Sequence, residues 1–130
     1  MDEESIISEV GQYFAKRAGD LVATYVFGSV ARRTSGPSSD VDIAVLFAVP
    51  PARTLAGLPL ETEAELEQLL GRPVQVVVLN GAPVDLVHRV LRDGVLVYEA
   101  DRAVRVNFEV AARREYLDLL PILRRYRKAA

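Results

Sequence analysis

The chain has 130 residues, of which 50% are hydrophobic and 26% are charged, and its formal net charge is −2. This length is close to the commonest size of one domain, and the composition excludes a disordered protein. We therefore expect residues 1–130 to form a single domain with one hydrophobic core.

Cysteine content, hydropathy and charge exclude several further classes. The chain has no cysteine, which excludes disulfides and thiolate metal sites. Its longest apolar run, residues 43–49, is far shorter than the roughly 18 residues of a membrane span, so we expect a cytoplasmic protein without membrane contact. The small net charge argues against direct nucleic-acid binding, although residues 101–130 carry eight Arg or Lys against four Asp or Glu.

Hydrophobic periodicity predicts helices and strands that alternate along the chain. The first half is expected to hold a helix over 4–16, a buried strand over 21–27, one or two helical turns over 29–33, a loop over 34–39 and a strand over 40–47. The second half is expected to hold an exposed connection over 48–59, a helix over 61–70, a strand over 74–79, a helix over 84–92, a strand over 95–98 and a helix from 101 onward. Thr62 and Glu65 are spaced as a capping box at the start of the helix over 61–70. Pro121 is expected to kink or split the last helix. These elements predict an α+β fold, with a mixed sheet of about four strands and helices mainly on one face.

The most informative motif begins where the first predicted strand ends. Gly28 and Ser29 follow that strand directly, and Asp40 and Asp42 begin the next one. Gly28 permits a sharp backbone turn and lets a phosphate approach without meeting a Cβ atom. Ser29 offers a hydroxyl and, at a helix start, backbone N–H groups that favour an anion.

The two aspartates are expected to form a metal site. A pleated strand directs Asp40 and Asp42 to one face and Val41 and Ile43 to the other. Two adjacent carboxylates are costly unless a cation neutralises them, and Mg²⁺ prefers a few carboxylates together with phosphate and water oxygens. This pattern indicates a nucleoside triphosphate and Mg²⁺ as ligands, as used in nucleotidyl transfer.

The motif resembles that of the polymerase beta-like nucleotidyltransferases, in which a Gly-Ser pair precedes Asp-x-Asp by a gap of about this length. The compact sequence Gly28-Ser29-Val30-Ala31-Arg32 is similar to that of the minimal nucleotidyltransferases, which typically act as antitoxins beside a HEPN-domain ribonuclease toxin. The resemblance implies a polymerase beta-like palm fold and transfer of AMP from ATP to a tyrosine of that toxin. It also implies that Gly28, Ser29 and Arg32 bind the nucleotide and that Asp40 and Asp42 are the catalytic metal ligands.

One position departs from the family pattern. Gln75 stands where the next strand commonly supplies a third carboxylate. A glutamine oxygen is a weaker, neutral metal ligand and cannot act as a general base. Two antitoxin readings therefore stay open, an active transferase and a catalytically weak or inactive antitoxin that neutralises the toxin by binding. A transferase acting on a small molecule is a third reading, but such enzymes usually carry an additional acceptor domain.

Other candidates have simpler structural explanations. We expect His88 to be a packing or surface residue rather than a ligand. The alternating glutamates at 61, 63, 65 and 67 are interpreted as a solvated helix face. The basic cluster at the C-terminal end is expected from the helix dipole alone.

Overall fold

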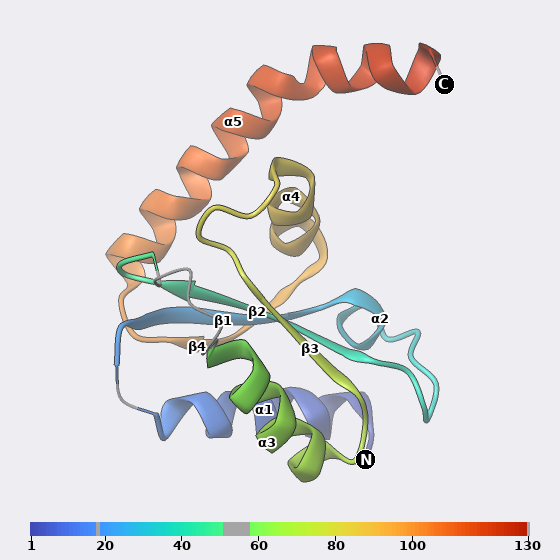
Figure 1. The fold of residues 1–130 in the computed structure, drawn as a ribbon, viewed down its shortest axis with the longest axis vertical. Coiled ribbons are helices and arrows are strands. Elements are labelled where there is room, and N and C mark those ends of the chain that lie inside the picture. The colour runs from blue at the N-terminus through green and yellow to red at the C-terminus, as the bar shows by residue number, and fades with distance from the viewer. Residues whose placement is uncertain (18, 51–57, 130) are drawn as a thin grey trace.

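The computed structural model describes residues 1–17, 19–50 and 58–129, with helices packed against a central sheet (Figure 1). In chain order the elements are α1 (Glu3–Ala15), β1 (Leu21–Phe27), α2 (Gly28–Ala31), β2 (Val41–Phe47), α3 (Leu58–Leu70), β3 (Val74–Val78), α4 (Val84–Asp93), β4 (Val95–Glu99) and α5 (Arg102–Ala129). The predicted connection over 48–59 lies largely on residues 51–57, outside the described part of the chain.

The four strands form one mixed sheet in the order β3-β2-β1-β4. β1 pairs antiparallel with both β2 and β4, while β2 and β3 are parallel and joined through α3. The predicted α+β class and the mixed four-stranded sheet are therefore confirmed.

Helices cover both faces of the sheet, and the expectation of helices mainly on one face is wrong (Figure 1). Buried residues of α1 and α3 pack with Val26, Ile43 and Val76 on one face, which we call the supporting face. Buried residues of α4 and partly buried residues of α5 pack with Tyr25 and Leu46 on the other, which we call the cleft face. Both faces carry apolar side chains, so each needs a covering layer.

The start of α3 also differs from the prediction. The helix begins at Leu58, because a proline such as Pro59 is tolerated in the first helical turn. Thr62 consequently lies inside the helix and is buried, so the predicted capping box with Glu65 is wrong.

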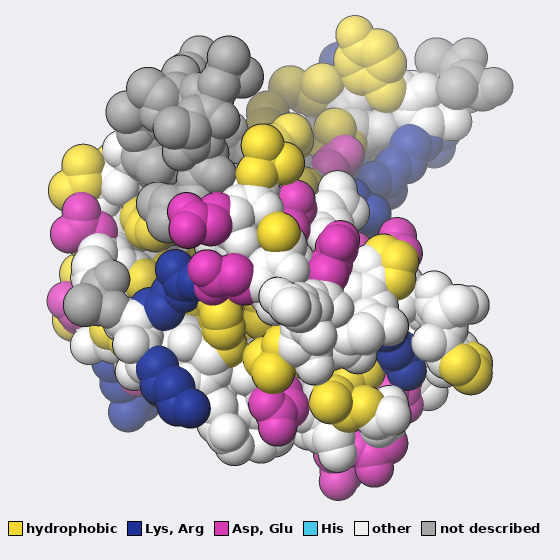
Figure 2. All heavy atoms as spheres, turned by 60° about the horizontal axis from the view of Figure 1, so that its bottom comes forward, with side chains coloured by type: hydrophobic (Ala, Val, Ile, Leu, Met, Phe, Trp, Pro, Cys, Tyr) yellow, Lys and Arg dark blue, Asp and Glu magenta, His cyan; other side chains and the backbone are white. Residues whose placement is uncertain are grey.

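The glutamates of α3 have structural partners, although Figure 2 shows acidic side chains scattered over this side of the molecule. Glu63 and Glu67 accept hydrogen bonds from the backbone N–H groups of Val76 (2.7 Å) and Val74 (3.1 Å). They thereby occupy the free edge of β3, an edge that would otherwise offer unpaired donors to another strand. Glu65 contacts Tyr13 and Arg17. Glu61, Glu65 and Glu67 are exposed, as expected of a solvated helix face, and the row also bonds neighbouring elements.

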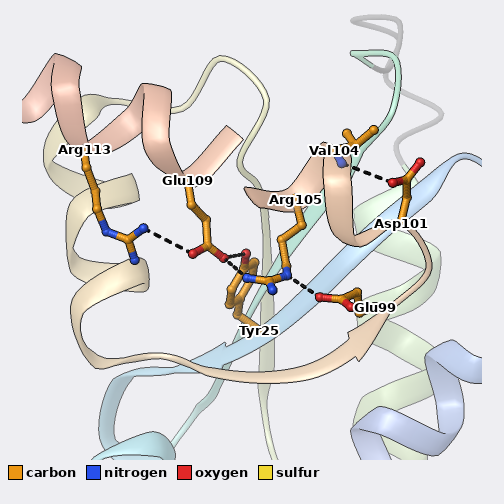
Figure 3. A network of polar contacts seen from close by, with 7 residues as sticks. All are labelled: Tyr25, Glu99, Asp101, Val104, Arg105, Glu109 and Arg113. Carbon is orange, nitrogen blue, oxygen red and sulfur yellow. Dashed lines mark hydrogen bonds and ion pairs between the residues drawn. The ribbon is translucent and has the colours of Figure 1, made fainter. Parts of the chain in front are cut away.

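The 28-residue helix α5 is held to the sheet by its first half (Figure 3). Glu109 accepts hydrogen bonds from the buried Tyr25 hydroxyl (2.6 Å) and from Arg105 Nη1 (2.6 Å), and Arg105 also contacts Glu99. Burial raises the pKa of Tyr25. Burial alone would raise the pKa of Glu109 too, but the hydrogen bonds from Tyr25 and Arg105 outweigh it and the pKa is lowered.

The second half of α5 extends beyond the sheet (Figure 1). The helix continues through Pro121 and bends in its C-terminal part, so the proline kinks α5 and does not split it. Within the described ranges, no helix is long and apolar enough to cross a membrane.

Candidate functional site

A cleft of about 320 Å³ opens on the cleft face, where β1 ends and β2 begins. Four elements contribute to it: the end of β1, the short helix α2, the start of β2 and the outer side of α4. Its lining residues are Phe27, Gly28, Ser29, Arg32, Asp42, Arg89 and Asp93.

Gly28 and Asp42 meet at the floor of this cleft. Phe27 pairs with Asp42 in the β1 and β2 ladder, so the next residue, Gly28, turns away directly beside the carboxylate. Gly28 has a φ of 72°, and a Cβ atom built there would lie 2.2 Å from Oδ2 of Asp42. Only glycine fits this position, because both the backbone angle and the carboxylate exclude a side chain.

The loop between the two halves of the motif is tied down at several points. Its Ser35 donates from the backbone N–H (3.1 Å) and from Oγ (2.8 Å) to Glu3 of α1. Ser39 Oγ accepts from the Gly36 N–H (2.8 Å), and the Val41 N–H donates to the Pro73 carbonyl (2.9 Å). These bonds fix the path of the chain into β2, just before which Asp40 lies.

Asp40 and Asp42 have different surroundings. Asp42 is half-buried in the cleft, whereas Asp40 is exposed and lies outside the cleft lining. The pKa of Asp42 is raised, first by burial and then by the charge of Asp40, while Arg32 and Arg89 act in the opposite direction. The two aspartates are therefore close enough to repel, as expected for a pair that a cation would stabilise.

Gln75 lies beside Asp42 on the neighbouring strand. The parallel register pairs these two residues directly, so their side chains leave the sheet on the same face. Gln75 is exposed and is not among the residues that line the cleft.

Arg89 and Asp93 are site residues that the sequence interpretation missed. They are four residues apart on α4 and so share one side of that helix. Asp93 accepts two hydrogen bonds from Arg92, at 3.0 Å and 2.8 Å, and these lower its pKa. The helical spacing was visible in the sequence, but nothing there indicated that this side of α4 meets the cleft.

The carboxylate oxygens of the site suit a hard cation whose coordination shell also includes phosphate oxygens. Over the described ranges, no three His, Cys, Asp or Glu side chains are arranged to hold a metal ion by themselves. Asp40 and Asp42 offer the one or two carboxylates with which Mg²⁺ is usually held when substrate phosphates and water complete its coordination. The residues present therefore fit Mg²⁺ that arrives with a triphosphate.

His88 is placed as predicted, away from any cluster of potential ligands among the described residues. Its ring stacks on Tyr116 of α5, with centroids 3.5 Å apart and planes inclined by 3°. It therefore helps to join α4 to α5.

The comparisons with known proteins agree with this geometry. The profile of the family described as polymerase beta, nucleotidyltransferase, matches residues 9–103. The chain is 35% identical to a protein assigned as a minimal nucleotidyltransferase, with a TM-score of 0.57 over 73% of this chain and 95% of that one. No curated protein matches the chain.

Two solved complexes share the fold over almost the whole chain. A toxin-antitoxin complex with AMP-PNP contains a chain 24% identical, with a TM-score of 0.78, covering 99% of this chain and 98% of that one. The complex of a tri-AMPylated Shewanella oneidensis HEPN toxin with an MNT antitoxin contains a chain 20% identical, with a TM-score of 0.66, covering 95% of this chain and 98% of that one.

Proposed function

Because the chain belongs to the polymerase beta nucleotidyltransferase family, we propose that it is an antitoxin that transfers AMP from ATP to a HEPN ribonuclease toxin. The proposal treats residues 1–130 as one minimal nucleotidyltransferase domain that acts in the cytoplasm. Its choice of partner is supported by fold neighbours such as the MNT antitoxin in complex with an AMPylated HEPN toxin.

The approach of Asp42 to Gly28 is the observation that carries the proposal. It places a half-buried carboxylate against a turn that has no side chain, with Ser29 at the start of α2 beside it. A phosphate can enter such a turn closely, and the adjacent carboxylates can share a cation with it. An ordinary surface turn does not require a carboxylate so close to its glycine.

Each cleft residue then has a role in transfer. We assign the triphosphate to Gly28, Ser29, Arg32 and Arg89, with Arg32 directly after α2 and Arg89 on α4. Asp40 and Asp42 would hold Mg²⁺, which would neutralise charge on the phosphate oxygens. The acceptor hydroxyl attacks the α-phosphorus, the bond from that phosphorus to the bridging oxygen of the β-phosphate breaks, pyrophosphate leaves, and the hydroxyl proton passes to solvent.

Gln75 supports a second candidate function. A neutral amide is paired with Asp42 in the sheet, at the position where the family resemblance leads us to expect a further carboxylate. With weaker metal binding, the chain would still occupy the toxin without modifying it. In this alternative the protein is a catalytically weak or inactive antitoxin that acts by contact.

The test is to incubate the purified chain with the HEPN-domain protein encoded beside it, together with Mg²⁺ and ATP. Intact-mass spectrometry then records any mass added to either protein. The proposal expects additions to the partner in whole AMP units that disappear with Asp42→Asn. Asp85→Asn is the matched control, because it makes the same chemical change on an exposed residue outside the cleft.

Three outcomes separate the candidates. Added AMP that depends on Asp42 establishes the transferase. A stable complex without added mass establishes the contact-only antitoxin. Neither a complex nor added mass contradicts both.

A further inference from the structure

The two halves of α5 are anchored very differently. The first half contributes Phe108 and Ala112 to the core of the cleft face and Arg105 and Glu109 to the network of Figure 3. Among the described residues, none of α5 beyond Ala112 belongs to the hydrophobic core of either face. Beyond Ala112, the stack of Tyr116 on His88 continues the attachment of α5 to α4.

The second half of α5 nevertheless has the pattern of a helix that packs. Leu119, Ile122, Leu123 and Tyr126 follow the i, i+3, i+4 and i+7 spacing of one helix face, and we call them the apolar stripe. Leu119 and Leu123 are half-buried, whereas Ile122 is 50% exposed and Tyr126 is 74% exposed. Single exposed apolar residues are ordinary, but a regular stripe on a projecting helix marks a surface that is covered by something else.

The charges around the stripe indicate what covers it. Four exposed cations, Arg124, Arg125, Arg127 and Lys128, surround its C-terminal end, and no Asp or Glu follows Asp118 in the sequence. None of the four takes part in an ion pair with another described residue. In Figure 2 basic and apolar side chains occupy the projecting end of the chain together. The helix dipole accounts for the cations but not for the apolar stripe.

A groove links this helix to the site. His88, Leu91 and Arg92 of α4 and Arg113, Tyr116 and Leu117 of α5 line a hollow of about 250 Å³. The cleft lies on another side of α4, where Arg89 and Asp93 line it. Arg92 of the groove contacts Asp93 of the cleft, with Nη2 and Oδ2 2.8 Å apart. A protein seated in the groove would therefore lie next to the cleft.

We infer that the apolar stripe and the α4–α5 groove together form the docking surface for a partner protein, and that this partner presents an apolar helical surface edged by carboxylates. The inference rests on the proposed function for the partner's identity and adds where and through what chemistry it binds. Two copies of this chain paired symmetrically through the stripe would bring four cations of each copy together, which costs free energy. An acid-edged partner matches both the stripe and the cations, and it would present its acceptor hydroxyl close to the triphosphate.

The experiment compares binding of the neighbouring HEPN-domain protein by wild-type chain, Ile122→Glu and the triple variant Arg124→Glu, Arg125→Glu, Arg127→Glu, using isothermal titration calorimetry. Val106→Glu is the matched control, because Val106 is 39% exposed on the anchored half of the same helix. We expect the dissociation constant to rise on the order of a hundredfold for Ile122→Glu and for the triple variant, and to stay unchanged for Val106→Glu. Circular dichroism and thermal unfolding show that each variant keeps its fold.

Each contrary outcome contradicts a different claim. If the wild type binds the partner and both α5 variants bind equally well, the docking surface is wrong while the proposed function stands. If the wild-type chain alone is a dimer that Ile122→Glu dissociates, a second copy covers the stripe and the inference is overturned. If the wild type does not bind the partner at all, the proposed function fails and the inference fails with it.

Discussion

The two faces of the sheet are made from alternate residues of the same strands, yet they serve different purposes. On β2, Val41, Ile43 and Val45 point to the supporting face, and all are buried among apolar residues of α1 and α3. The same strand directs Asp42 to the cleft face, where it is half-buried in the cleft. Each face thus depends on the other, because the residues flanking a carboxylate in a strand necessarily enter the opposite core.

The supporting face holds an electrostatically unfavourable group of the cleft face in place. The pKa of Asp42 is raised by burial and by Asp40, so the folded chain holds this carboxylate where its charge is disfavoured. The apolar side chains of Val41 and Ile43, fully buried behind it, keep the strand in position. Apolar packing on the supporting face therefore stabilises the strand that carries Asp42 on the cleft face.

The largest expected effect comes from weakening the supporting face. Ile43 is fully buried, so Ile43→Ala removes apolar contacts and leaves a cavity, lowering the free energy of unfolding by about 2–5 kcal/mol. Urea unfolding followed by circular dichroism measures this change. Val106→Ala, at a 39% exposed position, is the control and should change stability by less than about 0.5 kcal/mol. A similar loss in both variants would mean that Ile43 has no special role in cohesion.

The next effect comes from filling the turn on the cleft face. In Gly28→Ala the new Cβ would displace Asp42, and we expect the rate of AMP transfer to fall on the order of a hundredfold. Gly81→Ala is a close control, because Gly81 also has a positive φ, of 76°, but no atom lies within 4 Å of an added Cβ. Both variants carry the backbone strain of a positive φ, so only the contact with Asp42 separates them. Equal activity in the two variants would contradict the role given to Gly28.

Two adjacent residues of β1 allow a hydroxyl group to be removed on each face. Tyr25 faces the cleft side and donates to Glu109, so Tyr25→Phe should lower the free energy of unfolding by about 1.5 kcal/mol. Thr24, on the supporting side, is fully buried and its Oγ1 has no hydrogen-bond partner among the described residues. Thr24→Val should therefore raise the free energy of unfolding by about 1 kcal/mol.

Acid should reduce the effect of Tyr25→Phe but not that of Thr24→Val. The lowered pKa of Glu109 means that its ionised form stabilises the fold above the usual pKa of a glutamate, and that this contribution is lost as pH falls through the lowered pKa. Urea unfolding at neutral and acidic pH checks both the signs and this difference. Loss of stability in both variants would show that the supporting face also makes use of its hydroxyl.

The strands and the motif were predictable because they depend on local pattern. Residues 21–27 were predicted as a strand, and β1 is Leu21–Phe27. The nearness of Gly28 to Asp42 follows once two antiparallel strands begin and end at the motif. The family resemblance placed Gln75 at the position of a third carboxylate on the next strand, and the parallel register of β2 and β3 pairs it with Asp42.

The arrangement of the helices was not predictable by the same means. Periodicity shows that α4 has an apolar side, but it does not indicate which sheet face that side covers, so helices were wrongly expected mainly on one face. For the same reason Arg89 and Asp93 were missed, since their place in the cleft depends on how α4 docks. The early start of α3 at Leu58 was missed because Pro59 is equally typical of a loop and of a first helical turn.

The last expected effect concerns the strand beside Asp42. Gln75→Asp places a carboxylate on β3 in register with Asp42, on the cleft face where a third metal ligand would lie. If Mg²⁺ binding limits the wild-type chain, AMP transfer should rise on the order of tenfold and saturate at lower Mg²⁺, as a charged ligand holds the ion more tightly. Gln75→Asn shortens the side chain in the same way without adding charge and should leave the rate unchanged. A slower Gln75→Asp variant would show that the amide is part of the working site and that two carboxylates suffice for transfer by this chain.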